Sequence, residues 1–484
     1  MKKTFKNVMM LVTAMTLSLG FASCSDDNDD PKTNSDIVPV AELAAVSDTY
    51  VNDVVYPTYQ ALRDNSKTLH EACAKLYANA KAGSLSDADV EAACEAFKNA
   101  RLQWERSEAF LYGAATDHEI DPHIDTWPLD HDQLVEALND ATVMDGIKNQ
   151  GSQYVFEKNG KFDSTLGFHG LEFVLFRNGA ARKAADFAAN ETEEGMTSVA
   201  GIDELAFADA VSGDIYNMTT LLHYGWTQDN TDYSWINNNC KWVFEVDENN
   251  AEEGTTTGGK NGLCKDNIGY GAWLLKGNTT DGWFQTWQET LENACVAGCS
   301  NICQEVYTQK LGQAFRVASG QGGTTEDGEK ESRDYIESPY SKRSYIDYQD
   351  NIYSIKNSLY GTRDVTATTP VTNSMMNIMK KYNYSGYNDI NTALNEAIAA
   401  LETAKNSSSF VADIAAIEKA YKNGTINSSS FVADIAAIEK AYKNGTINSE
   451  AAYTRVKTCI DKINNLDDEL NKAGAWFRKI RASK

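Results

Sequence analysis

The chain has 484 residues and a formal net charge of −25 at pH 7, with 69 acidic residues against 44 basic ones. Such a surface repels the phosphates of nucleic acid and of anionic lipid, and we exclude nucleic-acid binding on this ground. A chain of this length also exceeds what one hydrophobic core usually supports, which favours two domains or one domain with large insertions.

The first 24 residues have the pattern of an export signal. Three lysines precede an apolar run over residues 8–19, which is too short for a permanent membrane helix. Residues 21–24, Phe-Ala-Ser-Cys, resemble a lipoprotein cleavage box in which Cys24 is acylated and becomes the first mature residue. An ordinary signal that is cleaved with loss of Cys24 is the alternative. Cleavage removes the three lysines, so the formal charge moves from −25 to −28.

Residues 25–37 form an aspartate-rich tether that we predict to be disordered. The acidic stretch also resembles the tag that sends some Gram-negative lipoproteins to the outer face of the outer membrane. We therefore expect an outer-membrane lipoprotein that is anchored through Cys24 and exposed at the cell surface, with a periplasm-facing position as the alternative. No second apolar stretch is long enough to span a membrane.

Helical periodicity predicts helices over residues 38–111, and Ser86 with Asp89 forms a capping box at the start of one of them. Trp104 and Glu108 lie one turn apart at the far end of that helix. The pattern alone allows Glu108 to be either an exposed helix carboxylate or part of a site.

The following segment, residues 113–132, is predicted to be a loop with an unusual density of potential oxygen and nitrogen ligands, among them Asp125 and Asp130. Hard cations prefer carboxylates, and imidazole suits iron, zinc and copper. The spacing matches no closed metal-binding loop, and a solvated acidic loop would have the same composition.

Residues 164–176 place a histidine and a glutamate among residues that prefer to be buried. His169 and Glu172 are separated by three positions, so their side chains leave one face of a helix and can address one bound ion. Spacing alone fits a structural His–Glu pair equally well. Gly167, just before His169, allows another backbone to approach the start of this helix closely.

Helical patterns return over residues 205–226 and 283–317, on either side of an irregular insertion at about 227–280. Eight cysteines remain after Cys24, an even number that permits disulfides in an exported chain. Cys240 and Cys264 flank the insertion and make the most natural pair. Three further cysteines recur every four residues, for which core packing or one disulfide with a leftover thiol is favoured over a three-thiol metal site: Cys295, Cys299 and Cys303.

The last third of the chain is also predicted to be helical. Residues 333–359 contain five tyrosines, which fit either a helix core or a stacking surface for a sugar or haem, and Ser341 is a predicted helix N-cap. Residues 406–428 recur identically as residues 427–449. Each copy is one short amphipathic helix, so we expect two copies to compete for one groove and one to be displaced to the surface. Residues 451–480 form the closing helix.

Several of these strings together resemble the imelysin family: Gly167-x-His169-x-x-Glu172, the stretch from Trp104 to Gly113, the string Asp125-Thr126-Trp127-Pro128-Leu129-Asp130, and Ser338-Pro339-Tyr340-Ser341. Helical periodicity everywhere outside the insertion predicts an all-α protein built from bundles. The resemblance implies two packed four-helix-bundle domains with an irregular insertion, the motif region facing the interface between the domains. The first domain would cover residues 38–190, and the second, residues 191–484, would contain the insertion and the duplication at 406–449. The resemblance also implies a role in bacterial iron uptake.

Carried onto this chain, the resemblance gives the candidate metal-binding or ligand-binding residues His169, Glu172, Asp130, Asp125 and Glu108. The positions that would support the motif are Gly167, Trp127, Pro128, Trp104 and Ser341.

Three functions follow as hypotheses. The first is a lipid-anchored protein that captures iron or an iron-bearing ligand between its domains without catalysis, together with iron-uptake proteins of the cell envelope. The second is a metallopeptidase holding zinc, because the family is grouped with metallopeptidases. A zincin, however, needs two histidines at i and i+4, and this motif offers one histidine with glutamate at i+3. The third is surface glycan binding. No glycine-rich dinucleotide turn is present, so we expect no nucleotide or flavin cofactor.

Overall fold

The computed structural model describes residues 37–157, 164–191, 196–240, 268–325, 328–423 and 447–483. Over these residues the chain is almost entirely helical, which confirms the predicted all-α class, and its strands form two short pairs. Within the same ranges no helix is both long and apolar enough to cross a bilayer. The predicted signal peptide and nearly all of the acidic tether lie outside the described residues.

The first bundle is built on a long N-terminal helix, which runs through α2 (Val40–Thr49), the π-helical turn η2 (Tyr50–Val55) and α3 (Tyr56–Lys81). The chain returns as α4 (Asp87–Glu105), which begins at the predicted capping box. Ser86 Oγ accepts from the Asp89 N–H, and the Asp89 carboxylate accepts from the Ser86 N–H. The apolar residues of α3 follow helical spacing, and the side chains of one stripe are fully buried: Tyr59, Leu62, Leu69, Cys73 and Leu76.

Helix α11 (Gly201–Thr227) is the centre of this bundle, because it lies along α3 and nearly every residue from Glu204 to Trp226 is buried. A helix buried on all sides belongs to the interior of a large assembly of helices. Helix α10 (Gly167–Leu175) packs against α11 and α4. The first bundle therefore includes α11, which lies beyond residue 190, and the predicted boundary at that residue stays a prediction.

Shorter elements connect the long helices of this bundle: η3 (Glu108–Phe110), α5 (Ala114–Asp117), α6 (Ile120–Ile124), α7 (His131–Asn139), α8 (Ala141–Gln150), α9 (Ser152–Glu157), β2 (Phe176–Arg177), β3 (Ala180–Ala181) and η5 (Ala184–Ala188). Strands β2 and β3 form an antiparallel pair. The segment 113–132, predicted as a loop, thus contains two short helices, α5 and α6.

The second bundle begins with one helical run that contains two π-helical segments. It comprises α14 (Trp287–Glu289), η7 (Thr290–Ala297), α15 (Gly298–Glu305), η8 (Val306–Lys310) and α16 (Gly312–Ala318), of which η7 and η8 are π-helical. The remaining helices are α17 (Ser344–Tyr360), α18 (Met375–Lys381), α19 (Tyr387–Ser407), α20 (Phe410–Lys422) and α22 (Ile447–Lys479). Tyr345 and Tyr348 of α17 are buried, so these two tyrosines belong to the helix core rather than to a stacking surface.

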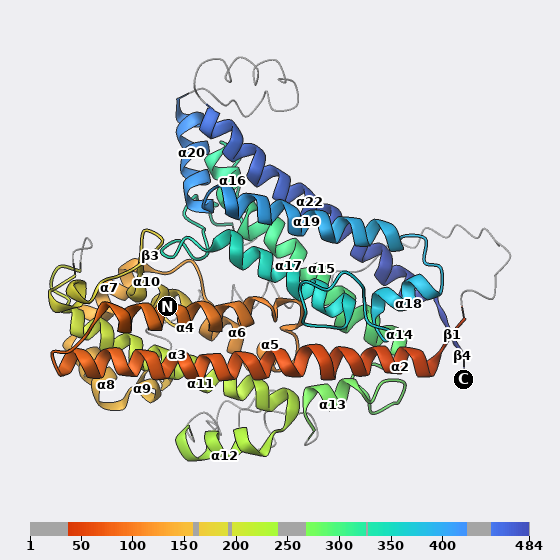
Figure 1. Ribbon diagram of the computed structural model, residues 1–484, viewed down its shortest axis with the longest axis horizontal. Coiled ribbons are helices and arrows are strands. Elements are labelled where there is room, and N and C mark those ends of the chain that lie inside the picture. Colours follow the sequence, from red (N-terminus) through yellow and green to blue (C-terminus); the bar gives the residue numbers. More distant parts are fainter. Residues whose placement is uncertain are drawn as a thin grey trace.

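The two bundles lie one above the other, the first as a horizontal layer and the second as a slanted layer (Figure 1). Helices α15 and α17 face the first bundle, where they contact η3 and α4. At one end of the molecule β1 (Ile37–Pro39) pairs in parallel with β4 (Arg481–Ser483), which brings the two ends of the described chain side by side.

The insertion is described only at its flanks, which are helical: α12 (Asn230–Asn239) and α13 (Tyr270–Leu274). Cys240 is a buried thiol that donates to Asn217 Oδ1 at 2.8 Å, and Cys264 lies outside the described residues, so their pairing stays a prediction. The three regularly spaced cysteines are buried free thiols of the second bundle whose pKa values burial raises: Cys295, Cys299 and Cys303. Core packing is therefore their role here.

The first copy of the duplicated segment forms α20, which packs against α16 and α22. Its Phe410, Ile414 and Ile417 are fully buried, and the Asp413 carboxylate accepts hydrogen bonds from Tyr345 Oη at 2.8 Å and Arg455 Nε at 3.0 Å. Most of the second copy lies outside the described residues, so displacement of one copy to the surface stays a prediction.

Candidate metal centre

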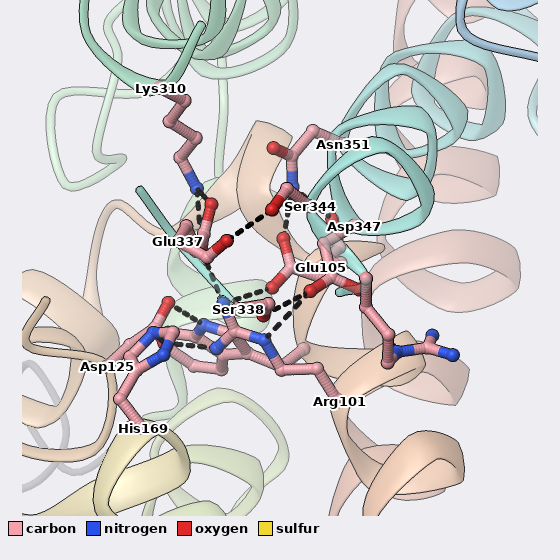
Figure 2. Close-up of polar contacts among 12 residues, drawn as sticks. Arg101, Glu105, Asp125, His169, Lys310, Glu337, Ser338, Ser344, Asp347 and Asn351 are labelled. Atoms are coloured by element: carbon pink, nitrogen blue, oxygen red, sulfur yellow. Dashed lines mark hydrogen bonds and ion pairs between the residues drawn. The ribbon is translucent and has the colours of Figure 1, made fainter. Parts of the chain in front are cut away.

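The sequence motifs meet in a buried group of charged side chains between the two bundles (Figure 2). We refer to nine residues as the interface cluster. The first bundle supplies Arg101 and Glu105 from α4, Glu108 from η3, Asp125 from the end of α6, and His169 and Glu172 from α10, and the second supplies Lys310 from η8, Glu337 from the loop before α17, and Asp347 from α17. Each of the nine residues is at most 7% exposed.

The start of α10 is fixed by the close approach that Gly167 permits. Gly167 has φ +65°, and a Cβ at this position would lie 1.9 Å from the carbonyl oxygen of Ile124. Only a residue without a side chain fits such an approach in the left-handed region. The contact holds α10 against the end of α6, and it places His169 Nε2 at 3.1 Å from Asp125 Oδ1.

Glu172 lies one turn after His169 on the same helical face, as the i, i+3 spacing predicts. Its Oε2 is 3.7 Å from His169 Nδ1. Its other oxygen, Oε1, accepts two hydrogen bonds from Ser341, from the backbone N–H at 2.7 Å and from Oγ at 2.6 Å. Ser341 was predicted as a helix N-cap, but α17 begins at Ser344, and Ser341 instead ties the second bundle to the motif.

The guanidinium of Arg101 is the hub of the cluster. It is fully buried, it forms ion pairs with Asp125 and Glu337, and its Nη2 lies 2.5 Å from Glu105 Oε1. Asp125 is held a second time by Trp104, whose Nε1 donates to Oδ2 at 2.7 Å. Glu105 in turn accepts from Asn351 Nδ2 of α17 at 2.5 Å. Arg101 therefore connects α4 and α6 of the first bundle with the loop before α17 of the second.

Lys310 enters the cluster from the opposite side, at the end of the π-helical turn η8 (Figure 2). Its Nζ lies 3.5 Å from Glu108 Oε1 and 3.3 Å from Glu337 Oε2. Burial acts to lower the pKa of Lys310, but the surrounding carboxylates, Glu108 and Glu337 foremost, raise it well above its usual range. Lys310 is therefore a permanent cation of the cluster.

Carboxylates outnumber positive charges in this part of the described structure. The cluster has six carboxylates and two permanent cations, and Arg343 Nε adds a third cation 3.4 Å from Asp347 Oδ1. Burial raises the pKa of Glu105 and of Glu108 well above the usual range, although Arg101 and Lys310 oppose the rise. Burial likewise raises the pKa of Asp347 to about 6. Protons therefore occupy part of the cluster when no other cation is bound.

His169 and Asp125 differ from these carboxylates, because both of them carry a charge at neutral pH. Burial alone would raise the pKa of Asp125, but the Arg101 guanidinium and the neighbouring His169 imidazole lower it below its usual range. Burial alone would lower the pKa of His169, but its close contacts with the Asp125 and Glu172 carboxylates raise it to about 9. The pair is therefore an imidazolium and a carboxylate at neutral pH.

Two sets of three side chains in the described residues each bring one ligand atom per residue within 4.8 Å of one another: Asp125, His169 and Glu337, and Glu105, Glu108 and Asp125. Asp125 belongs to both sets. Glu172 belongs to neither set, and its contacts with His169 and Ser341 make it the group that orients the imidazole.

The structure brings together most of the predicted site residues, namely His169, Asp125, Glu108, Trp104, Ser341 and Glu172. Asp130 is the exception. It is exposed and caps α7 by accepting from the Gln133 N–H at 2.9 Å, and among the described residues it belongs to neither ligand set. Trp127, joined to Pro128 by a cis peptide, packs against Tyr335 with the ring centroids 4.3 Å apart and the planes tilted by 48°, and its ring lies 5.8 Å from Lys310 Nζ at the edge of the cluster.

Sequence reasoning missed Arg101, Glu105, Lys310, Glu337 and Asp347. Two signals were available. Arg101 and Glu105 sit four residues apart on the predicted helix whose apolar stripe includes Trp104, and Glu337 directly precedes the matched Ser338-Pro339-Tyr340-Ser341 string. Lys310 carried no signal, because its position depends on the π-helical winding of η8.

The fold and the site together define the class of protein: it is an all-α protein of two bundles with a buried charged cluster at their interface. The imelysin family model (Peptidase_M75) matches residues 55–442, which is most of the chain, and the protein therefore belongs to the imelysin family.

The chain is also similar in sequence to one further protein and in structure to two others. Iron-regulated protein A of Synechococcus elongatus is 32% identical over 127 residues, which are 26% of this chain and 30% of that protein, so the chain matches less than a third of that relative. The crystal structure of an iron-regulated protein A precursor from Parabacteroides distasonis has the same fold, with a TM-score of 0.62 at 20% identity over 91% of this chain and 96% of that one. An imelysin-like protein from Psychrobacter arcticum has a TM-score of 0.49 at 11% identity over 92% of this chain and 98% of that one.

We predict that Gly167→Ala lowers the free energy of unfolding by about 2 to 4 kcal/mol, because the new Cβ both strains the backbone and meets the Ile124 carbonyl. Gly151→Ala is the matched control, since Gly151 also has positive φ but a Cβ there has nothing within 4 Å. Urea unfolding of the two variants measures the difference. Equal losses in both would contradict a role for the close approach.

We predict that His169 in the metal-free protein keeps its proton through neutral pH and loses it near pH 9. Because this pKa lies above the ordinary value of about 6.5, the stabilisation from the imidazolium is fully present below about pH 6.5 and is lost as the pH rises through about 9. The ¹⁵N chemical shifts of the imidazole nitrogens report the midpoint, and Asp125→Asn should lower it. A wild-type midpoint near the ordinary value would refute the assignment.

Proposed function

We propose that the interface cluster binds an iron ion, or a ligand that carries iron, as part of bacterial iron uptake and without catalysing a reaction. The observation that carries the proposal is the excess of carboxylates over cations, because six buried carboxylates face Arg101, Lys310, the His169 imidazolium and Arg343 at the edge of the cluster. Burying carboxylates without enough positive charge is costly, so a multivalent cation is a favourable occupant of such a site.

Four buried carboxylate oxygens of the cluster have spare capacity for a metal ion. Each faces a cationic side chain but receives no directed hydrogen bond: Glu105 Oε1, Glu172 Oε2, Glu337 Oε2 and Asp347 Oδ1. Oxygens of this kind are uncommon in protein interiors, where buried polar atoms are normally paired. The residues present therefore fit a bound cation, with Asp125, His169 and Glu337 as the set that would hold it once His169 gives up its proton.

The donor set also bears on the kind of metal. One imidazole nitrogen with several carboxylate oxygens suits iron, manganese or zinc, whereas soft metals prefer thiolates. The cysteines of the described ranges are buried thiols in the helix cores, and burial raises their pKa values. None of them belongs to either ligand set. The name of the cyanobacterial relative, iron-regulated protein A, supports iron among these metals.

The deep burial of the cluster supports binding without catalysis. A catalytic zinc keeps an open position for water and substrate, and the zincin pattern uses two histidines. Here one histidine belongs to the ligand sets, and it is 2% exposed. A zinc peptidase is the alternative that the experiment below distinguishes.

We predict that the purified mature protein binds Fe²⁺ under anaerobic conditions and Mn²⁺ in air. His169→Ala and Asp125→Asn should each lower the affinity by at least about a hundredfold, because the first removes a metal ligand and the second removes the charge of a ligand that also pairs with His169. Isothermal titration and elemental analysis measure binding. His223→Ala is the matched control, since His223 is a buried histidine that pairs with Asp232 in a different part of the first bundle.

The outcomes separate the candidate functions. Binding that is lost in His169→Ala, with no peptide cleavage by the wild type, supports the binder. Retained zinc with cleavage that disappears in the same variant would establish the peptidase instead. If the wild type and both variants behave alike in all assays, the cluster is a structural ion-pair network.

We also propose that the protein is held at the outer membrane by lipid on Cys24 and faces the cell surface, where iron-bearing ligands arrive. The support is the sequence of residues 1–37. We predict that Cys24→Ala moves the protein from the membrane fraction to the soluble fraction. Labelling with a palmitate analogue gives an independent readout, and membrane retention of an unlabelled wild type would contradict the anchor.

A further inference from the structure

Lys310 differs from Arg101 in how the cluster holds it. The Arg101 guanidinium has close contacts with Glu105, Asp125 and Glu337 and lies 5.3 Å from the ring centre of Phe168, so it is fixed on several sides. The Lys310 ammonium lies 3.3 to 3.6 Å from its carboxylate partners. Longer contacts of a flexible side chain with several partners indicate a weaker and more exchangeable hold.

The carboxylate partners of Lys310 also differ in how deeply they are buried. Glu337 is fully buried, and Glu108 is 3% exposed in its side chain, whereas the side chain of Glu305 is 40% exposed and lies 3.6 Å from the same ammonium. The Lys310 backbone is held separately, because its carbonyl accepts from Tyr348 Oη at 3.1 Å. The ammonium can therefore move outward to Glu305 while the backbone stays in place.

Lys310 contacts one carboxylate from each candidate ligand set. Glu337 belongs to the set with Asp125 and His169, and Glu108 belongs to the set with Glu105 and Asp125. A cation that occupies these oxygens competes with an incoming metal ion for them, and its charge repels the ion.

We propose that Lys310 is a displaceable counter-ion of the metal site. In the metal-free protein its ammonium neutralises Glu108 and Glu337, and when a metal ion enters it moves to Glu305. Lys310 thereby weakens metal binding and favours release, as transfer of a cargo ion requires. This inference rests on the proposed function, because it concerns regulation of the same site.

The test compares Mn²⁺ binding by the wild type and Lys310→Met. Methionine keeps an unbranched side chain of similar length without the charge. The expected result is a Kd about tenfold lower in the variant, with slower release of Mn²⁺ to a chelator, because the competing charge is gone. Lys356→Met is the matched control, since Lys356 is 7% exposed and donates to the Val365 carbonyl at 2.7 Å outside the cluster. A folded Lys310→Met variant with unchanged or weaker binding would overturn the proposal.

A second measurement uses the wild type and so does not depend on folding of the variant. A water-soluble N-hydroxysuccinimide ester labels lysines, and peptide mass spectrometry gives the extent at Lys310 with and without Mn²⁺. Displacement toward Glu305 predicts more labelling of Lys310 in the presence of Mn²⁺, while labelling of Lys356 stays constant. Equal or reduced labelling of Lys310 would overturn the displacement.

The proposed function and the role of Lys310 can fail separately. If the wild type does not bind Fe²⁺ or Mn²⁺, the proposed function and the role of Lys310 both fall. If the wild type binds and His169→Ala does not, but Lys310→Met leaves affinity and release unchanged, only the displaceable counter-ion is wrong.

Discussion

The buried guanidinium of Arg101 is the constraint on which the interface depends. It is fully enclosed, and it joins carboxylates of α4 and α6 to Glu337 of the second bundle, 236 positions further along the chain. Removing one partner of a buried ion pair typically costs about 3 to 5 kcal/mol, because the other charge is left without compensation. The two bundles therefore have one favourable relative position in which Arg101, Asp125 and Glu337 are all paired.

This constraint explains why the site lies where it does. Once Arg101 fixes Asp125 and Glu337, the close approach at Gly167 brings His169 to the same carboxylate. Ser341 of the second bundle then binds Glu172, which orients the imidazole. Residues from both bundles thus complete one polar centre. A cation bound there would interact with both bundles at once, so occupancy would be linked to how tightly the bundles are joined.

Irregular backbone positions the remaining polar groups. Lys310 ends a π-helical turn, and π-helical turns inside longer helices are frequent at functional sites. The loop between Glu337 and α17 contains two residues other than glycine with positive φ, Ser338 and Lys342. Ser338 Oγ donates to Asp347 at 2.6 Å, which offsets part of the conformational cost. These features aim side chains into the cluster that regular helices would direct elsewhere.

The sequence by itself determined the all-α class, the capping box at Ser86, the shared helical face of His169 and Glu172, and the glycine required at position 167. These features depend on short-range geometry, which the spacing of residues encodes directly. Only the tertiary structure decided that Asp125, and not Asp130, is the partner of His169, that α11 belongs to the first bundle, and that Arg101, Lys310 and Glu337 complete the centre. Contacts between distant elements follow from how the bundles pack, so local patterns can mark Arg101 and Glu337 as candidates but cannot show that these residues meet.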